Sequence, residues 1–205
     1  ELIKYLKENG IVASVGHTNS KSADIEKAIE MGLSNVTHTF NAQKPLHHRE
    51  IGTVGSALLY DELNCELICD TIHVSVPAIK LVVKSKPHDK VTLITDAMRA
   101  KHMPDGDYEL GGQPVIVKNG EARLHNGTLA GSVLRMNHAV RNVHNLAGVE
   151  LGHVIEMASL NPAKNLGVDK ERGSIKVGKY ADLVVLDENF EVVMTISEGN
   201  VIFQR

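Results

Sequence analysis

The sequence contains no tryptophan and only two cysteines, three phenylalanines and four tyrosines among its 205 residues. Its net charge is −3, and acidic and basic residues are mixed along the chain, so it has no electrostatic footprint for nucleic acid or an anionic membrane. No apolar run approaches the roughly 20 residues that a membrane-spanning helix needs. We therefore expect neither a nucleic-acid partner nor a membrane partner.

The two cysteines do not predict a disulfide. Cys65 and Cys69 are four residues apart within one predicted strand, which places them on the same face about 13 Å from one another, too far for a bond. A reduced, cytoplasmic location is therefore expected.

The sequence also does not begin with methionine. Residue 1 is glutamate, and Leu2, Ile3 and Leu6 have helical spacing from the start. We expect this chain to be the C-terminal portion of a longer protein.

The first half of the sequence alternates between strand and helix patterns. Apolar, β-branched runs predict strands at 11–15, 35–40, 66–72 and 91–95. Helical patterns at 20–31, 54–60 and 77–84 separate these strands. Such alternation is typical of βαβ units and predicts a parallel sheet.

The second half has a different pattern. Asn119-Gly120 lies between two alternating runs and predicts a β-hairpin, which we expect to form an insertion at about 107–131. Helices are predicted at 133–146 and 152–159, and short strands at 174–176, 181–186, 192–196 and 200–203. We expect one domain at 1–165, containing the hairpin insertion, and strands of a small β domain at 166–205.

Each predicted parallel strand runs into an ionisable residue at or near its carboxyl end. These residues are His17, His38, His73 and Asp96. Catalytic groups gather at the carboxyl ends of strands in barrels and α/β sheets. A single histidine at such a place is more often structural, but four in succession predict an active site.

His17 and His38 follow adjacent strands, about 4.8 Å apart in a sheet, so their imidazoles could converge on one divalent cation. A third protein ligand is normally needed, and no carboxylate on these strands is an obvious candidate. Zinc is the expected metal, and iron, cobalt and manganese are alternatives.

Asp96 ends an apolar strand, where burying a carboxylate is costly without a partner. A metal-activated water molecule is a suitable partner, and Asp96 could then act as the general acid/base. The alternative is that Asp96 caps a following helix.

The segment Asn41-Ala42 together with Arg49 could bind an anion, because backbone N–H groups and a guanidinium suit a phosphate. A plain loop and a surface arginine are an equally good interpretation of these residues.

Several motifs occur together in a characteristic order and spacing. They are Gly16-His17-Thr18, Thr37-His38-Thr39-Phe40-Asn41-Ala42, Cys69-Asp70-Thr71-Ile72-His73, Ile94-Thr95-Asp96-Ala97, Thr128-Leu129-Ala130-Gly131-Ser132, and the ending Gly173-Ser174-Ile175 with Gly178-Lys179-Tyr180-Ala181-Asp182-Leu183. In these motifs the chain resembles the N-acetylglucosamine-6-phosphate deacetylases of the amidohydrolase superfamily.

The resemblance implies an α/β fold, namely the second half of a (β/α)8 TIM-like barrel plus strands of a small β-sandwich domain. It implies hydrolysis of N-acetylglucosamine 6-phosphate to glucosamine 6-phosphate and acetate, in amino-sugar catabolism. His17 and His38 would be metal ligands, a metal-activated water the nucleophile, and Asp96 the general acid/base.

The same resemblance implies how a small-molecule sugar phosphate binds. His73 would contact the sugar phosphate, and Asn41 and Ala42 would offer backbone amides to its phosphate. Arg49 would reach a phosphate across the interface of a homodimer of the full-length protein, and Leu129 would line the pocket.

Two departures from the family pattern stand out. The metal-binding glutamate of an earlier strand is not in this chain, so we expect the isolated chain to bind metal poorly and to be inactive. Gln43 stands where methionine is expected. The alternatives are another amidohydrolase, either dihydroorotase-like or an amino-acid deacetylase, and an inactive barrel fragment that binds or scaffolds without catalysis.

Overall fold

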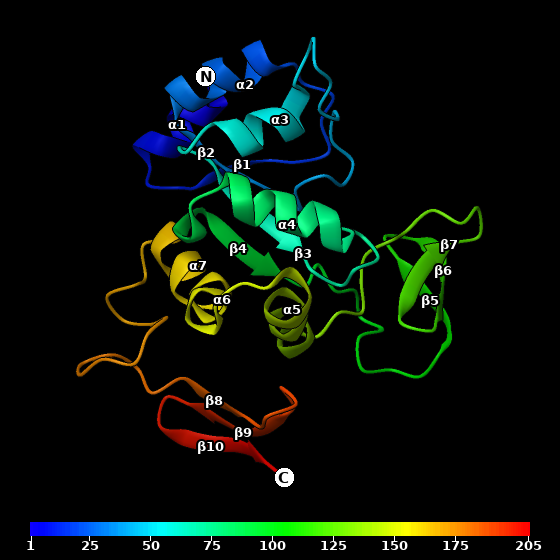
Figure 1. The fold of residues 1–205 in the computed structure, drawn as a ribbon, viewed down its shortest axis with the longest axis vertical. Helices are drawn as coiled ribbons and strands as arrows, with labels where there is room; N and C mark the ends of the chain where they lie inside the picture. The colour runs from blue at the N-terminus through cyan, green and yellow to red at the C-terminus, as the bar shows by residue number, and fades with distance from the viewer.

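Three separate β-sheets organise the chain, and only the first is parallel (Figure 1). The computed structural model describes all residues from 1 to 205. The parallel sheet has the order β1-β2-β3-β4, so strands that follow one another in sequence are neighbours in space. Its strands are β1 (Ala13–Val15), β2 (Leu33–Val36), β3 (Asn64–Ile68) and β4 (Val91–Ile94).

The predicted alternation of strands and helices is thereby confirmed, but the strands are shorter than expected. The predictions for 35–40 and 66–72 are wrong at their carboxyl ends, where the chain turns instead. His38, Phe40 and Thr71 have positive φ angles of 34°, 82° and 70°, which an extended strand does not allow. The expected ionisable residues therefore lie in turns just beyond the sheet.

Helices pack on one face of this sheet. They are α1 (Leu2–Glu8), α2 (Ser22–Met31), α3 (Gly52–Leu59) and α4 (Val76–Ser85), then α5 (Met136–Asn142), α6 (Leu151–Ala158) and α7 (Leu160–Asn165). A short 3-10 helix (His88–Lys90) precedes β4, and a π-helical segment (Val143–Ala147) continues α5. As the sequence predicts, α2 ends at Gly32, whose φ of 114° suits glycine alone.

The core lies between the sheet and these helices. Val36, Leu67 and Leu93 from the strands meet Ile79 and Val154 from α4 and α6, and all are almost fully buried. The other face of the sheet is polar. There, Asn35 donates from Nδ2 to Ser14 Oγ at 3.0 Å and to Glu66 Oε1 at 2.7 Å.

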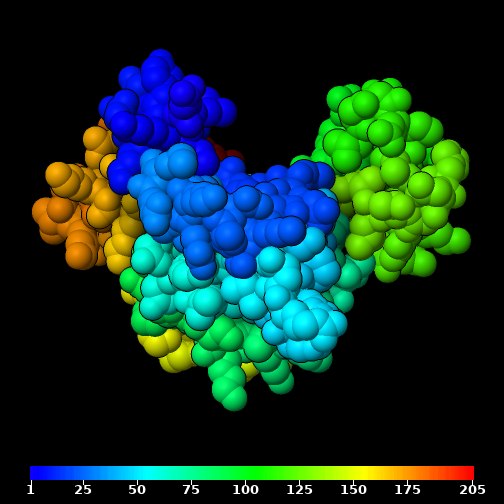
Figure 2. All heavy atoms as spheres, turned by 90° about the horizontal axis from the view of Figure 1, so that it is seen from above, coloured from blue at the N-terminus to red at the C-terminus, as the bar shows by residue number.

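The second sheet lies between β4 and α5 in sequence and projects from the body of the chain as a separate lobe (Figures 1 and 2). It contains β5 (Gly106–Leu110), β6 (Gln113–Lys118) and β7 (Glu121–Leu124), all antiparallel. The predicted hairpin is β6–β7, and its turn residues Asn119 and Gly120 have φ angles of 53° and 80°. The prediction missed β5, which pairs with β6.

The third sheet is at the C-terminal end and is also antiparallel, in the order β10-β9-β8. Its strands are β8 (Leu183–Leu186), β9 (Val192–Ser197) and β10 (Asn200–Gln204). The strand predicted at 174–176 is wrong, because this segment pairs with no other strand and Ile175 is exposed. Asn137 of α5 joins the sheet to the body by donating to Phe190 O at 2.8 Å. None of the helices is both long and apolar enough to cross a membrane.

Candidate active site

The carboxyl ends of β1 to β4 share one edge of the parallel sheet, and the predicted site residues follow these strands. Strained backbone marks this edge. His17, His38 and Asp96 have positive φ angles of 43°, 34° and 49°. Positive φ is uncommon for residues other than glycine and tends to occur where the surrounding structure holds a residue for a functional purpose.

His17 and His38 form the centre of this edge. Their ring centroids are 4.8 Å apart and the rings are inclined by 74°. The prediction that the two imidazoles lie side by side is confirmed. His17 is exposed, whereas His38 is 7% exposed and its Nδ1 atom is buried without any hydrogen-bond partner. A buried nitrogen without a partner is costly, so this atom is a natural place for a ligand.

These two histidines fit a divalent metal ion, because imidazole nitrogen is a ligand for zinc and its neighbours in the first transition series. The unpartnered Nδ1 atom of His38 is the observation that supports this fit. Within the chain, no three His, Cys, Asp or Glu side chains are grouped closely enough to hold a metal. The chain thus supplies two ligands of a candidate site.

The turn after β2 is fastened to the turn after β1. Gln43 donates from Nε2 to Thr37 O at 2.7 Å and accepts the Phe40 amide on Oε1 at 3.2 Å. The Thr18 amide donates to Ala42 O at 3.0 Å. Gln43, which departs from the expected methionine, therefore holds both ends of the turn that carries His38.

A cavity of about 450 Å³ lies where these two turns meet. This strand-end hollow is lined by His17, Thr18, Asn19, Ala42, Gln43, Lys44 and Pro45. Of the predicted anion-binding amides, that of Asn41 is already used, because it donates to His38 O at 3.0 Å. The Ala42 amide makes no hydrogen bond within the chain. Ala42 is therefore the better candidate donor to a ligand.

Arg49 does not line the strand-end hollow. Its side chain is exposed, and its Nη1 atom lies 2.8 Å from Nε2 of His48. The structure thus leaves the Arg49 guanidinium at the surface of its own chain, apart from the two metal-ligand candidates.

Asp96 lies two residues beyond the end of β4 and is exposed. The expectation of a carboxylate buried at the end of an apolar strand is wrong, because the strand ends at Ile94 and the chain then turns outward. The alternative role as a helix cap is also wrong, because no helix begins before α5. Asp96 is therefore free to meet solvent or a ligand.

The segment around Leu129 holds Asp96 in place. The Ser132 amide donates to Asp96 O at 3.0 Å, and Ser132 O accepts the Met98 amide at 2.9 Å. Gly131 has a φ of 68°, and a Cβ atom there would lie 3.6 Å from Asp96 O. Sequence reasoning missed this positioning role, because the two segments are 36 residues apart in the sequence.

His73 follows β3 and is paired with a carboxylate that sequence reasoning did not single out. Its Nδ1 atom lies 2.6 Å from Asp70 Oδ2, and both side chains are only 8% exposed. Burial opposes ionisation of Asp70, but the His73 ring and the amides of Ile72 and His73 more than offset this, so the pKa of Asp70 is lowered. Asp70 is an ionised partner of His73.

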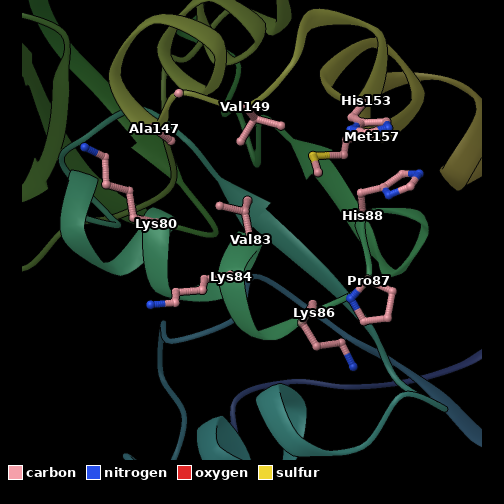
Figure 3. A pocket seen from close by; sticks show the side chains of 11 residues that line it. Lys80, Val83, Lys84, Lys86, Pro87, His88, Ala147, Val149, His153 and Met157 are labelled. Carbon is pink, nitrogen blue, oxygen red and sulfur yellow. The ribbon is translucent and has the colours of Figure 1, made fainter.

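A second and larger cavity, of about 620 Å³, lies away from the strand-end edge (Figure 3). This lysine groove is lined by Lys80, Val83, Lys84, Lys86, Pro87, His88, Ala147, Gly148, Val149, His153 and Met157. The rings of His88 and His153 are stacked there, with centroids 3.9 Å apart. None of the predicted site residues lines it.

Comparison with known proteins places this geometry in a family. The Bacillus subtilis (strain 168) protein called N-acetylglucosamine-6-phosphate deacetylase is 45% identical over 203 residues, covering 99% of this chain and 51% of that protein. An N-acetylgalactosamine-6-phosphate deacetylase of Escherichia coli O157:H7 is 39% identical, covering 97% of this chain and 52% of the relative. The chain spans about half the length of these curated relatives.

Solved structures agree. A mutant N-acetyl-D-glucosamine-6-phosphate deacetylase of Mycobacterium smegmatis, in complex with N-acetyl-D-glucosamine-6-phosphate, matches with a TM-score of 0.93 and 33% identity. The match covers 98% of this chain and 53% of that one. A model of the amidohydrolase family matches residues 2–202. The nearly complete match and the strand-end histidines lead to one conclusion: the chain belongs to the amidohydrolase family.

Proposed function

We propose that this chain carries metal-binding and proton-transfer residues of an N-acetylglucosamine-6-phosphate deacetylase, a hydrolase that acts on a C–N bond outside peptides. The reaction converts N-acetylglucosamine 6-phosphate and water into glucosamine 6-phosphate and acetate. The observation that carries the proposal is the His17–His38 pair, with its unpartnered nitrogen, at the edge of the parallel sheet. The named relatives supply the substrate class.

His17 and His38 hold a divalent metal ion in this proposal. Such an ion, when bound, supplies Lewis-acid stabilisation of developing negative charge and lowers the pKa of a water molecule towards 7. Zinc is the proposed metal, and iron, cobalt and manganese are the alternatives, because imidazole nitrogen suits all four.

Asp96 is the general acid/base. Its exposed carboxylate takes a proton from the attacking water and returns it to the nitrogen of the leaving amine, which departs poorly as an anion. The hydrogen bonds from the Ser132 segment support this role, since they fix the turn on which the carboxylate stands.

The remaining proposed contacts bind the sugar phosphate. The backbone amide of Ala42, together with that of Asn41 once it is released from His38 O, meets the phosphate. His73 contacts the sugar phosphate, and Leu129 lines the pocket. Arg49 reaches the phosphate from the second subunit of a homodimer. Its exposed position outside the strand-end hollow of its own chain supports a role across an interface.

The architecture proposed to surround this site is a (β/α)8 barrel. Residues 1–165 supply its second half, with the 107–131 insertion, and 166–205 supply strands of a small β-sandwich. The parallel sheet with helices on one face and polar side chains on the other supports this arrangement. The free, buried Cys65 and Cys69 support a cytoplasmic location.

A second candidate substrate is the galactose epimer, N-acetylgalactosamine 6-phosphate. It is favoured by the relative from Escherichia coli O157:H7, which is 39% identical over 97% of this chain. The dihydroorotase-like and amino-acid deacetylase alternatives are not favoured, since the relatives compared above bear the names of amino-sugar phosphate deacetylases.

The experiment that tests this proposal measures metal content and acetate release for the native-length protein. Both epimers are supplied as 6-phosphates, with unphosphorylated N-acetylglucosamine as the control. The proposal expects bound metal and the highest kcat/KM with N-acetylglucosamine 6-phosphate. A higher kcat/KM with the galactose epimer selects the second candidate. A metal-loaded protein that releases no acetate from either phosphate overturns both.

A further inference from the structure

The turn between β3 and α4 contains a buried contact between the side chains of Asp70 and His73, which closure of the turn does not require. We propose that Asp70 is a positioning residue that fixes the ring orientation and the tautomer of His73, so that Nε2 of His73 is presented to the substrate. This inference rests on the proposed function, in which His73 contacts the sugar phosphate.

The two oxygens of Asp70 have different partners. Oδ1 accepts the amides of Ile72 and His73, both at 2.8 Å, which closes the turn. Oδ2 lies 2.6 Å from Nδ1 of the His73 ring. A turn alone would need only Oδ1, so the contact between Oδ2 and the ring is the part that points to a role through His73.

The pair is held rigidly. The side chains of Asp70 and His73 are each 8% exposed, so little water competes for the bond between them. Thr71, between them, has a φ of 70°, a strained conformation that the surrounding contacts must maintain. Asn142 of α5 donates from Nδ2 to Cys69 O at 2.9 Å, which ties the turn to the body of the chain.

This arrangement determines where the ring proton is. An ionised carboxylate can only accept a hydrogen bond, so Nδ1 of His73 must carry a proton and donate to Asp70. Nε2 makes no hydrogen bond within the chain, and it is not among the buried atoms that lack a partner, so it is accessible from outside. The neutral ring therefore presents an acceptor at Nε2, which suits a sugar hydroxyl, and the charged ring presents a donor, which suits a phosphate oxygen.

The substitution Asp70→Asn tests this assignment directly. Asparagine can keep the turn with Oδ1, but its Nδ2 group then faces the ring as a donor. The neutral ring must accept that bond on Nδ1 and move its proton to Nε2. The expected result is a reversed tautomer together with a loss in kcat/KM of roughly tenfold, the scale of one hydrogen bond to a charged group.

Two measurements on the native-length protein separate a positioning role from a merely structural one. Nitrogen-15 NMR of histidine-labelled protein, with the His73 signal assigned from the spectrum of His73→Gln, reports which ring nitrogen carries the proton. A kinetic cycle then combines Asp70→Asn with His73→Gln. If Asp70 acts through His73, the double variant is no slower than His73→Gln alone. Asp107→Asn, on exposed β5, is the matched control and should change nothing.

The outcomes are distinct from those of the proposed function. A native His73 whose neutral ring carries its proton on Nε2 overturns the inference without any variant, so a poorly folded Asp70→Asn protein does not leave it undecided. Additive losses in the kinetic cycle overturn it as well. Absence of acetate release from either sugar phosphate refutes the proposed function, while the tautomer can still be read from the spectrum.

Discussion

The lysine groove is the larger cavity, at about 620 Å³ against about 450 Å³ for the strand-end hollow, yet its buried lysine already has a partner. Lys86 donates to Tyr60 O at 2.6 Å, and Nε2 of His88 lies 3.5 Å from Glu156. Beside the strand-end hollow, the ring of His38 lies next to that of His17, and its buried Nδ1 atom has no partner. The strand-end edge therefore has a buried side-chain atom without a partner, whereas no residue that lines the lysine groove has one.

The two cavities also differ in the backbone conformation of the residues that line them. Gly148 is the only residue lining the lysine groove that has positive φ, and glycine adopts it without strain. At the strand-end hollow, His17 and Ala42 have φ angles of 43° and 51°. The volume of a cavity does not by itself indicate a functional site. Strained backbone and buried polar atoms without partners are better indicators, because a fold keeps such unfavourable features where they serve a function.

The largest expected effect is the loss of the metal. His17→Asn and His38→Asn, made in the native-length protein, should each reduce the bound metal and abolish turnover, because this pair is proposed to supply two of the metal ligands. The matched variants His88→Asn and His153→Asn, in the lysine groove, should keep both. Elemental analysis with an acetate-release assay decides. If His38→Asn kept its metal and His153→Asn lost it, the metal site would be in the lysine groove and not at the strand-end edge.

The next effect concerns proton transfer. Asp96→Asn should lower kcat by about 10²-fold or more, because the amide can neither take up nor release the proton. Glu156→Gln removes a carboxylate beside the lysine groove and should leave kcat unchanged. Steady-state kinetics on metal-loaded protein makes the comparison. Normal turnover by the Asp96→Asn variant would show that Asp96 is not the general acid/base.

The sequence was sufficient to predict the parallel sheet and the nearness of His17 and His38, because both follow from order and spacing. Strands with intervening helices allow few topologies, and neighbouring parallel strands fix the separation of the residues that follow them. The two ring centroids are 4.8 Å apart, so the side chains that follow β1 and β2 lie as close together as the order of the strands predicts.

Other features depend on contacts between distant residues and could not be predicted from a pattern. The bond from the Ser132 amide to Asp96 O joins segments 36 residues apart, across a separate sheet. The exposure of Asp96 depends on the exact residue at which β4 ends. The partner of His73 lies close in sequence, but only the turn through Thr71 makes the pairing evident.

A smaller effect distinguishes two glycines with positive φ. Gly131→Ala and Gly148→Ala should each cost about 1 kcal/mol of unfolding free energy, because alanine is strained at φ angles of 68° and 76°. Only Gly131 is beside Asp96, so only its variant should also lower kcat, by roughly fivefold for a disturbance of about 1 kcal/mol. Thermal unfolding and kinetics measured together test this. Equal kcat in both variants would show that the Ser132 segment does not position Asp96.

The smallest effects are on the pH dependence of stability, which should rise with pH in both regions but in different pH windows. The pKa of Asp70 is lowered in the folded chain, so its contribution is complete above the unfolded value of about 3.9 and is lost as pH falls below it. Asp70→Asn should therefore lose stability less steeply than the native protein below about pH 4. Unfolding in urea at a series of acidic pH values measures the slope.

Lys86, whose side chain has no exposed area, should affect the free energy of unfolding at higher pH than Asp70 does. Burial lowers its pKa, so between that lowered value and the ordinary value of about 10.4 the unfolded chain binds more protons than the folded one. Stability linked to Lys86 should then rise with pH in that window, and Lys86→Met should remove the rise. The variant also leaves Tyr60 O without its donor, so the slope with pH is the informative quantity. A slope unchanged in Lys86→Met would mean that this lysine is as well solvated in the folded chain as in the unfolded one, and the lysine groove would then have to be regarded as open to water at its base.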